Sequence, residues 1–396
     1  MRLNLAPICR PQKWKPLFNT LGGTARRSYA FQSGSLNFEV FNRRAKWLQK
    51  ERAAANAKEG RQADYLKDEV AMRVCERLLV SFHFPARFYF VFQTTNTITT
   101  QDVKRSFPLV LDLGANTCNI ARALLRPDPD PESEPPVTDP LATKITELVA
   151  AESSPSLLHR DVDHPSLDTT HVPNFKLTRH VLEHDELLPF SPDTFDMVLS
   201  SMSMHWVNDL PGVLSQINSV LKPDCPFIGA MLGGDTLYEL RTSLQLAEQE
   251  RKGGISPHVS PLADVRDVGG LLQRTGFKML TVDVEDIVVD YPDMFALMQD
   301  LQAMGEGNAV LGREMGPIGR DVLLAGDAIY RALYGNEDGS VPATFRIIHM
   351  IGWKESPDQA KPLRRGSGKA SLKDLLETPD GGQWRETLRE DDIDRT

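Results

Sequence analysis

The sequence predicts an α/β fold in which a mostly parallel sheet carries helices on both faces. From residue 107 onward, short apolar runs alternate with stretches of helical spacing, which is typical of βαβ units. The first buried run ends in an acid and a glycine and leads directly into a helix, an arrangement that brings backbone N–H groups to a ligand. With 41% hydrophobic residues among 396, the chain can bury a full core.

The apolar runs and helical stretches place the expected elements as follows. Core strands are expected near 108–113, 145–151, 177–182, 195–201 and 226–232, with helices at about 117–126, 209–222, 236–251 and 261–275. A valine-rich strand at 282–289 and an apolar strand at 344–353 follow, the second one after a turn at 336–339. We therefore expect a core at 102–232 and a C-terminal α/β extension of the same domain at 233–354, serving as a substrate or cap region.

Two irregular segments interrupt the core. Residues 127–140 are rich in proline and acid, and residues 161–176 are similar in kind. Both fall between a helix and the next strand, at the end of an open α/β sheet that lies away from the ligand crevice. We expect both to be solvated loops.

Residues 38–101 form an N-terminal helical segment with a foreign insert. Residues 64–79 predict an amphipathic helix packed on the main domain. Residues 80–101 are aromatic and threonine-rich, unlike the charged helices before them, and their ends could encode intron-edge sequences. One hypothesis is a retained intron in the gene; the alternative is a hydrophobic hairpin that docks on a membrane or partner, and sequencing the transcript decides between them.

Both ends of the chain have the composition of segments outside the fold. Residues 1–29 hold no acid and predict a mitochondrial transit peptide cleaved after Tyr29, the alternative being a disordered basic tail. Residues 355–396 are polar and charged, and we expect disorder there. The basic residues of the first segment are Arg2, Arg10, Lys13, Lys15, Arg26 and Arg27.

Charge and composition exclude several classes of protein. The formal net charge of -9 argues against a general nucleic-acid binder. No apolar run approaches the ~18 residues of a membrane span, so at most peripheral membrane association is expected. The four cysteines have no zinc-ligand spacing and suggest no disulfide framework, and we predict no metal site.

The strongest local signal is the turn after the first core strand. Asp112 and Gly114 end that strand, and Gly114 lets the backbone turn sharply and approach a ligand. The run resembles the first motif of S-adenosylmethionine (SAM) methyltransferases, D/E-x-G-x-G-x-G, but Asn116 and Cys118 stand where glycine is usual. Because cysteine tolerates positive φ poorly, we expect the loop to be reshaped and the SAM affinity to be affected.

Two further acids follow at strand ends. Glu152 follows Gly114 by 38 residues, of which 14 belong to the insert, close to the about 20 residues that separate a glycine loop from a ribose-binding acid. The alternative is a surface glutamate. Residues 184–198 resemble a type 11 methyltransferase run in which the adenine-facing acid aligns with His184, while Asp185 comes one place later.

Candidate catalytic residues come after the fourth and fifth core strands. Ser200 and His205 lie in the run that follows strand 195–201, and His205 is either a proton carrier or a histidine packed beside Trp206. In the next run, Asp235 is a natural N-cap, which leaves Tyr238 and Arg241 to face the crevice or to serve the structure.

Taken together, several blocks resemble the complex I assembly factor 5 family. They include LDLG, SSMSMHWVNDLP, FIGAMLGGDTLYELRTSLQLAE, MQDLQAMGE and NEDGSVPATFRIIHMIGWK, and the resemblance covers about residues 38–79 and 102–354. It implies a Rossmann-like class I SAM methyltransferase fold with SAM as the cofactor. Asp112, Gly114, Asn116, Glu152, Asp185 and Ser200 would then bind the cofactor, and His205, Tyr238 and Arg241 would be catalytic.

The resemblance also implies a place and a partner. The family lies in the mitochondrial matrix against the inner membrane and acts on assembly intermediates of complex I (NADH:ubiquinone oxidoreductase). Its reported chemistry is hydroxylation of an arginine on the iron–sulfur subunit near the quinone channel. Three hypotheses stay open from the residues: methyl transfer from SAM, arginine hydroxylation with an unidentified oxidising cofactor, and a binding factor with a decayed pocket.

Overall fold

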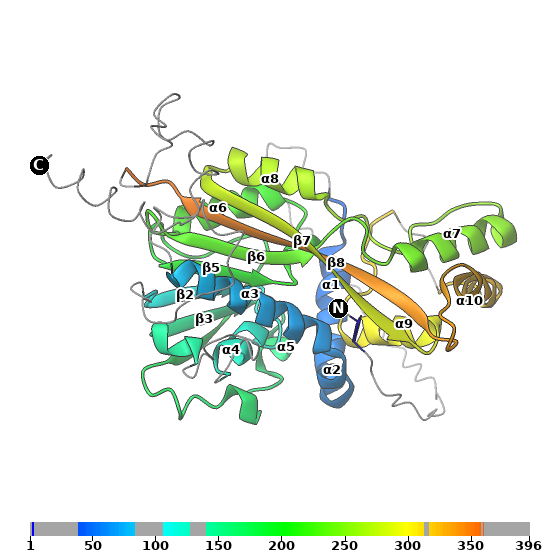
Figure 1. Cartoon of the computed structure of the whole chain (residues 1–396), viewed down its shortest axis with the longest axis horizontal. Coiled ribbons are helices and arrows are strands. Elements are labelled where there is room, and N and C mark those ends of the chain that lie inside the picture. The colour runs from blue at the N-terminus through cyan, green and yellow to red at the C-terminus, as the bar shows by residue number, and fades with distance from the viewer. Residues whose placement is uncertain are drawn as a thin grey trace, which may run out of the picture. The chain divides into compact units, whose positions relative to one another are not determined.

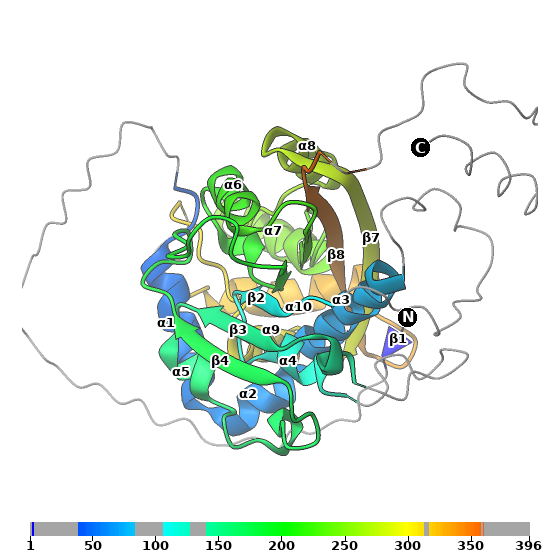
Figure 2. The ribbon, with the colours of Figure 1, turned by 90° about the vertical axis from the view of Figure 1, so that its left-hand side faces the viewer.

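The computed structural model describes residues 2–3, 39–83, 106–126, 140–312, 317–357 and 359. Its strands form one sheet in the order β1-β7-β8-β6-β5-β2-β3-β4. Neighbouring strands are parallel except at β8, which runs antiparallel to β6 and β7. Figures 1 and 2 show the helices that cover this sheet. The mostly parallel α/β fold predicted from the sequence is confirmed.

The predicted core elements are present. The strands are β2 (Leu109–Leu113), β3 (Glu147–Glu152), β4 (Lys176–Val181), β5 (Met197–Ser201) and β6 (Pro226–Leu232). The predicted helices are α4 (Asn119–Leu124), α6 (Leu210–Val220), α7 (Tyr238–Lys252) and α8 (Val265–Arg274). Short helices that the sequence did not reveal are α5 (Pro155–His159) and the 3-10 turns η2 (Leu141–Lys144), η3 (Pro165–Leu167) and η4 (Met204–Trp206).

The sheet buries apolar side chains on both faces. Along β2, Val110 packs into a core with α3 and α4, while the next residue, Leu111, packs into a second core with α6 and α8. This alternation follows from the two-residue period of a strand. Strands buried on both faces read as continuous apolar runs, which is why the core strands are visible in the sequence.

Three helices precede the sheet: α1 (Arg43–Ala55), α2 (Ala57–Ala63) and α3 (Tyr65–His83). The Asn42 side chain caps α1 by accepting from the Ala45 N–H, and Asn56 separates α1 from α2. The predicted amphipathic helix 64–79 is confirmed as α3, which buries Leu66, Val70, Val74 and Leu78. It runs to His83, so most of the suspect insert, residues 84–101, lies outside the described residues.

The C-terminal extension is built on two long strands, β7 (Phe277–Tyr291) and β8 (Val341–Lys354). They pair from Phe277 with Lys354 to Tyr291 with Val341. Figure 1 shows them reaching past β6 to the lobe that holds α7, α9 (Met294–Ala303) and α10 (Arg320–Tyr334). The sequence predicted both strands, though shorter, and did not predict α9 or α10.

The segments expected outside the core have mixed outcomes. The prediction of a solvated loop at 161–176 was wrong in part, because Asp161, Leu167, Val172 and Phe175 are buried. The insert at 127–139 lies outside the described residues. Of the predicted transit peptide, only β1 (Arg2–Leu3) is described, paired with β7. The predicted tail is described only at residues 355–357 and 359. Within the described part of the chain, no helix has the length and apolar character of a membrane span.

Candidate functional site

The turn after β2 approaches the Ser203 side chain so closely that position 114 must be glycine. Gly114 has φ 72°, and a Cβ there would lie 1.9 Å from the Ser203 Oγ. Its N–H and that of Ala115 both donate to the carbonyl oxygen of Ala151 on β3, at 2.8 and 3.1 Å. The end of β2 is thereby held against the end of β3.

The loop keeps a glycine-like backbone although two glycines are absent. Asn116 has φ 51° and Cys118 has φ 62°, both in the left-handed region. The expectation of a reshaped loop was therefore wrong: the side chains accept the positive φ, at a cost of order 1–2 kcal/mol for a residue such as cysteine. Cys118 is fully buried, and its thiol packs against the Leu158 carbonyl oxygen.

Asp112 is a buried acid without a partner among the described residues. It is 0% exposed, and neither carboxyl oxygen has a hydrogen bond. Burial, with the nearby Glu152 charge, raises the pKa of Asp112 well above its usual value. A buried polar group left unpaired in this way costs stability and calls for an explanation, and a missing ligand is one of the few available.

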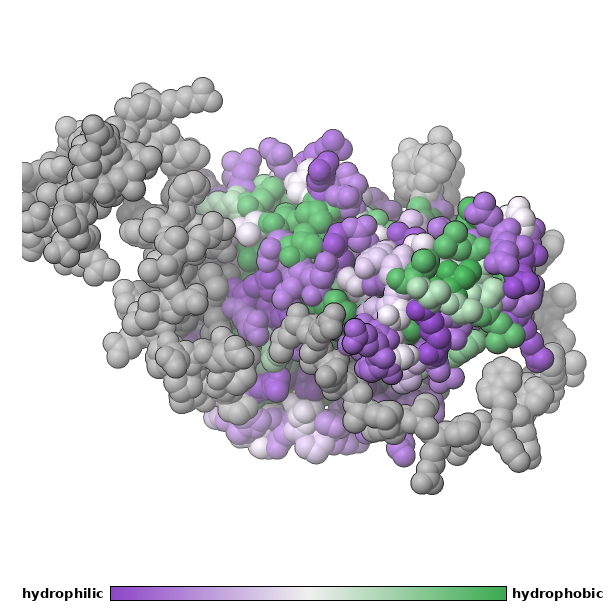
Figure 3. All heavy atoms as spheres, turned by 45° about the vertical axis from the view of Figure 1, so that its right-hand side comes forward, coloured by the Kyte–Doolittle hydropathy of each residue, from purple (hydrophilic) through white to green (hydrophobic). Residues whose placement is uncertain are grey.

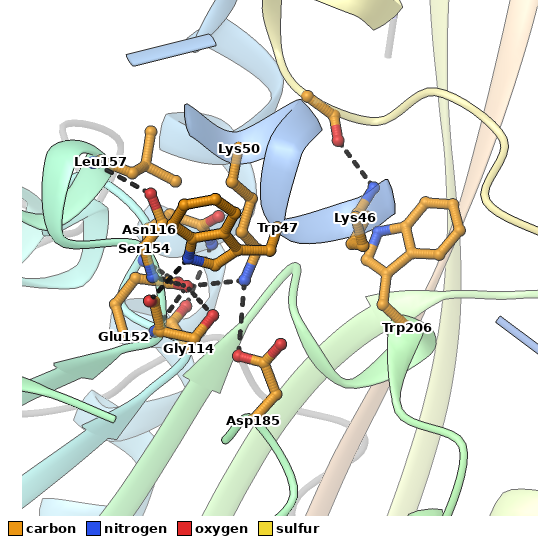
Figure 4. A network of polar contacts seen from close by, with 12 residues as sticks. Lys46, Trp47, Lys50, Gly114, Asn116, Glu152, Ser154, Leu157, Asp185 and Trp206 are labelled. Atoms are coloured by element: carbon orange, nitrogen blue, oxygen red, sulfur yellow. Dashed lines mark hydrogen bonds and ion pairs between the residues drawn. The ribbon is translucent and has the colours of Figure 1, made fainter. Parts of the chain in front are cut away.

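Glu152, at the tip of β3, is surrounded by donors (Figure 4). Its Oε1 accepts from the Lys50 Nζ at 2.7 Å, the Ser153 N–H at 2.9 Å and the Ser153 Oγ at 3.1 Å. Its Oε2 accepts from the Asn116 N–H at 3.1 Å. The cofactor loop and the acid of the second motif therefore meet directly, as the sequence predicted.

Lys50 reaches this acid from helix α1. Its ammonium is also 3.9 Å from the Asp185 carboxylate, and its side chain is only 8% exposed. Burial lowers the pKa of Lys50, but the charges of Asp185 and Glu152 outweigh burial and raise it above its ordinary value. Lys50 is a permanent cation between two of the predicted cofactor-binding acids.

The Asn116 side chain bridges the loop to the neighbouring strand. Its Nδ2 donates to the Gly114 carbonyl oxygen at 3.0 Å and to that of Ser201 at 3.2 Å. Its Oδ1 accepts from the Lys67 Nζ at 3.1 Å. The Asn116 side chain therefore fixes the loop to β5 through hydrogen bonds that a glycine at this position would not make.

A small cavity opens beside this loop. Its empty volume, which includes space open to solvent, is about 280 Å³. Gly114, Leu182, Asp185 and Ser203 are among its lining residues.

A second cavity lies on the other side of Trp206, against β6 and β8. Its empty volume is about 550 Å³. The walls are mainly leucines, and the polar groups that line it include Glu306, Ser260 and Asn308. The indole of Trp206 also faces it. This mixture of apolar walls and a few polar groups is typical of a binding pocket.

Glu306 is the centre of a buried cluster beside the second cavity. Its carboxylate accepts from the Trp206 Nε1 at 2.6 Å and from the His205 Nε2 at 3.1 Å. Its ion pairs with Lys46 and Lys67 measure 3.5 and 3.2 Å. Burial would raise the pKa of Glu306, but the two lysines hold it well below the usual value.

One ammonium group links the loop after β2 to Glu306. The Lys67 Nζ contacts Asn116 of the cofactor loop and, at 3.2 Å, Glu306 of the second cavity. It also donates to the Met304 carbonyl oxygen at 2.8 Å.

Comparisons with known proteins agree with this geometry. A family model described as a methyltransferase domain matches residues 86–282. The chain is 45% identical to the mitochondrial arginine-hydroxylase NDUFAF5 of Danio rerio, over 90% of this chain and 95% of that protein. The human protein of that name is 44% identical, over 85% and 83% of the two chains.

The chain belongs to the NDUFAF5 arginine-hydroxylase family. A more distant relative is a malonyl-[acyl-carrier protein] O-methyltransferase of Laribacter hongkongensis, 36% identical over 46% of this chain and 57% of that protein. The family has the Rossmann-like class I SAM methyltransferase fold expected from the sequence, and SAM is the cofactor of that fold.

The residues at the ends of β2 and β3 fit SAM. The unpaired Asp112 carboxyl, the Glu152 carboxylate and the cavity beside Asp185 offer acceptors along one edge of the sheet. Acidic groups suit a ligand with a cationic sulfonium and ammonium and two ribose hydroxyls. In the structure the Lys50 ammonium and the Asn116 backbone N–H donate to Glu152, whereas the Asp112 oxygens have no donor among the described residues.

The other predicted site residues are placed elsewhere. The Ser200 hydroxyl donates to the Leu113 carbonyl oxygen at 2.8 Å, which ties β5 to β2 inside the sheet. The His205 side chain is fully buried on Glu306, and burial lowers its pKa. This arrangement favours the packed histidine over the proton carrier.

Tyr238 and Arg241 do not face the crevice. Tyr238 is 42% exposed and stacks edge-on against Tyr334. It joins Leu246, Leu324 and Leu333 among the exposed apolar residues of α7 and α10, a lobe whose hydrophobic surface Figure 3 shows. Arg241 donates to the carbonyl oxygens of Gly234 and Thr236 and so closes the turn before α7.

The predicted N-cap at Asp235 was also wrong. Helix α7 is preceded by Leu237, at φ 54°, without a side-chain cap. Asp235 instead pairs with Arg346 of β8, because the antiparallel strand brings a guanidinium beside it.

Four charged residues of the site were missed by sequence reasoning: Lys46, Lys50, Lys67 and Glu306. The first two are four residues apart and so share one face of α1, which was the available signal. Lysines on a charged helix are usually solvated, and only the fold shows that these are buried. No cluster of three or more potential metal ligands occurs in the part of the chain that the structure describes.

Proposed function

We propose that this chain is a mitochondrial enzyme that modifies an arginine side chain of a protein, by hydroxylation, during complex I assembly. The observation that carries the proposal is the identity of 45% along 95% of a relative named arginine-hydroxylase. The two cavities support it, because one lies beside the Gly114 turn and Asp185 and the other has apolar walls with a few polar groups.

The cofactor seat proposed for SAM lies at the ends of β2 and β3. Glu152 accepts from the ribose, Asp185 lies on the nucleobase side, and Asp112 faces the cationic part of the ligand. Gly114 and Asn116 form the turn beneath it. SAM bound there would supply an electrophilic methyl sulfonium, which serves the methyl-transfer candidate below. Hydroxylation would in addition consume dioxygen and two electrons from a reductant, with water as the second product, and SAM supplies neither. Ser200 supports the seat from within the sheet.

The second cavity is proposed to take the arginine side chain. Its leucine walls exclude water from the aliphatic part of the side chain, and the Trp206 ring offers a face for a planar cation. The Lys46 ammonium already lies 3.3 Å from the centre of that ring, so the ring is accessible to cations in this fold. His205 and Lys67 hold the Glu306 carboxylate in place.

The partner proposed is the iron–sulfur subunit of complex I within assembly intermediates, in the mitochondrial matrix at the inner membrane. The support is the family and the word mitochondrial in the names of its members. The exposed apolar residues of α7 and α10 offer a surface for a large partner.

Mass spectrometry of that subunit tests the proposal. Cells that carry the wild-type chain should show an arginine heavier by one oxygen, and cells without the chain should show it unmodified. A Glu152→Ala chain should give the unmodified form if the reaction needs SAM. An unmodified arginine in wild-type cells would refute the enzymatic part.

A second candidate is methyl transfer to a protein or small molecule. The methyltransferase family model and the O-methyltransferase relative favour it. The same spectra separate the two, since methylation adds one methylene in place of one oxygen. No modification in any sample would leave an assembly factor that works by binding.

A further inference from the structure

Lys50 stands where a nucleoside would be expected. It projects from α1 over the end of the sheet and lies between Glu152 and Asp185 (Figure 4). These are the two acids proposed above to bind the ribose and to lie on the nucleobase side. When the two ribose hydroxyls donate to the two Glu152 oxygens, one of them meets Oε1, the oxygen that accepts from Lys50.

Oε1 of Glu152 has no acceptor capacity left, whereas Oε2 accepts from the Asn116 N–H. Oε1 already receives Lys50, the Ser153 hydroxyl and the N–H groups of Ser153 and Ser154. Of these donors, only the Lys50 ammonium belongs to a long side chain with several rotatable bonds. It is the donor that can leave without moving the backbone.

The charge of this corner explains why a cation lies there. Asp112, Glu152 and Asp185 place up to three acids around the end of the sheet, the first two fully buried. Lys50 is the cation that contacts Glu152 and Asp185 among the described residues. An uncompensated buried carboxylate is costly, so the seat needs a positive charge whether or not a ligand is bound. SAM carries positive charge of its own.

We propose that Lys50 is a built-in counter-ion that occupies the ribose position of the cofactor-free seat and is displaced when SAM binds. The inference rests on the SAM seat proposed above and deepens it.

The side chain moves while the helix stays. Helix α1 is fixed to the same corner by the Trp47 Nε1, which donates to the Ser153 carbonyl oxygen at 3.2 Å. The Ser154 hydroxyl donates to Glu51 at 2.6 Å. The Asp185 side chain is 37% exposed, so Lys50 has a partner at the edge of the seat when it leaves Glu152.

Displacement lowers the apparent affinity for SAM. When a ligand binds only the molecules with a free Glu152, its apparent Kd equals the intrinsic Kd divided by the fraction of such molecules. Removing the competing ammonium should therefore tighten SAM binding, by about tenfold if nine molecules in ten are occupied.

Calorimetric titration of the full chain with SAM tests this. Lys50→Met should bind SAM about tenfold more tightly than wild type, and Lys50→Arg, which keeps the cation, should bind no more tightly. The matched control is Lys58→Met, at an exposed lysine of α2, which should bind as wild type does. Equal or weaker binding by Lys50→Met would overturn the counter-ion role and make Lys50 structural or a cofactor ligand.

Thermal unfolding gives an independent readout. Without SAM, Lys50→Met should melt below wild type, because Glu152 loses its partner. Saturating SAM should raise the melting temperature of Lys50→Met by more than it raises that of Lys58→Met. A loss of stability that SAM does not reduce would contradict the proposal.

The wild-type chain supplies a test that needs no variant at position 50. The Lys50 amine should react slowly with an acetylating reagent in the cofactor-free protein and faster once SAM is bound. Slower labelling with SAM would overturn the displacement. Glu152→Ala separates the two proposals. If this variant binds SAM as tightly as wild type does, the proposed SAM seat is wrong. If Glu152→Ala loses SAM binding while Lys50→Met binds as wild type does, only the counter-ion role of Lys50 is refuted.

Discussion

Two lysines of α1, one helical turn apart, meet two buried carboxylates and respond in opposite ways. Lys50 pairs with Glu152 at 2.7 Å, and its pKa is raised. Lys46 pairs with Glu306 at 3.5 Å, and its pKa falls from 10.5 to about 7. Burial acts on both, so the difference comes from their neighbours.

The number of charges around each carboxylate accounts for the difference. Lys50 has a second acid, Asp185, nearby. Lys46 shares its single acid, Glu306, with a second cation, Lys67. Its neighbours therefore offset less of the pKa decrease that burial causes. Buried ion pairs therefore follow the local balance of charges, and the presence of one partner does not decide the protonation state.

The largest effect is expected at the shared acid. Glu306→Gln leaves two buried lysines without a counter-ion and should lower the free energy of unfolding by about 3–5 kcal/mol. Urea denaturation at neutral pH measures it. Glu59→Gln, on the exposed face of α2, should change that free energy by less than about 0.5 kcal/mol. Equal effects of the two would show that the cluster does not stabilise the fold.

The comparison of the two lysines predicts that replacing Lys50 destabilises the fold more than replacing Lys46 does. Without cofactor, Lys50→Met should destabilise by about 3 kcal/mol, because Glu152 loses its cation. Lys46→Met should cost about 1 kcal/mol, since Lys67, His205 and Trp206 still hold Glu306. Both are measured by urea denaturation near pH 7.5. The reverse order would contradict the account of their pKa values.

The pH dependence sharpens the same contrast. Between pH 7 and 10.5 the unfolded chain holds a proton on Lys46 that the folded chain lacks, so this group makes stability rise with pH. Replacing it by methionine should remove roughly 1–3 kcal/mol of that rise. Denaturation curves of wild type and Lys46→Met at pH 7 and 9.5 measure the difference. Parallel pH profiles would refute the lowered pKa.

The smallest effect is expected in the cofactor loop. Cys118→Gly relieves a left-handed φ of 62° but removes a buried thiol, and these contributions are opposite in sign. The free energy of unfolding should change by less than about 1 kcal/mol. Chemical denaturation is sufficient to test it, and a loss above about 2 kcal/mol would show that packing of the thiol dominates.

The sequence predicted the fold well because its core strands are buried on both faces and read as apolar runs. It also placed Asp112 and Glu152 correctly, since the carboxyl ends of adjacent parallel strands meet at one edge. It did not predict Lys50 in that seat, because the contact joins residues 102 positions apart. No local pattern encodes such a pairing.

Predictions failed where a distant group outcompeted a local one. Asp235 has the local chemistry of an N-cap, yet Arg346 takes its carboxylate. Tyr238 and Arg241 follow the same turn. The Tyr238 ring packs against Tyr334 of α10, and Arg241 donates to a carbonyl oxygen of the turn. Short-range propensity is a weak guide wherever a charged or aromatic partner arrives from another element.

Strands β7 and β8 run from the core into the C-terminal lobe and pair continuously from Thr281 to Tyr291, beyond a bulge between Lys278 and Thr281. A two-stranded ribbon of this length resists bending, because bending would break several hydrogen bonds between the strands at once. The second cavity, which rests on β6 and β8, therefore has a fixed floor. Its accessible wall is the segment between α7 and α8, which contributes His258, Ser260 and Leu262. Together with residues 306–308, which also line the cavity, this segment can vary in sequence without any change to the two strands.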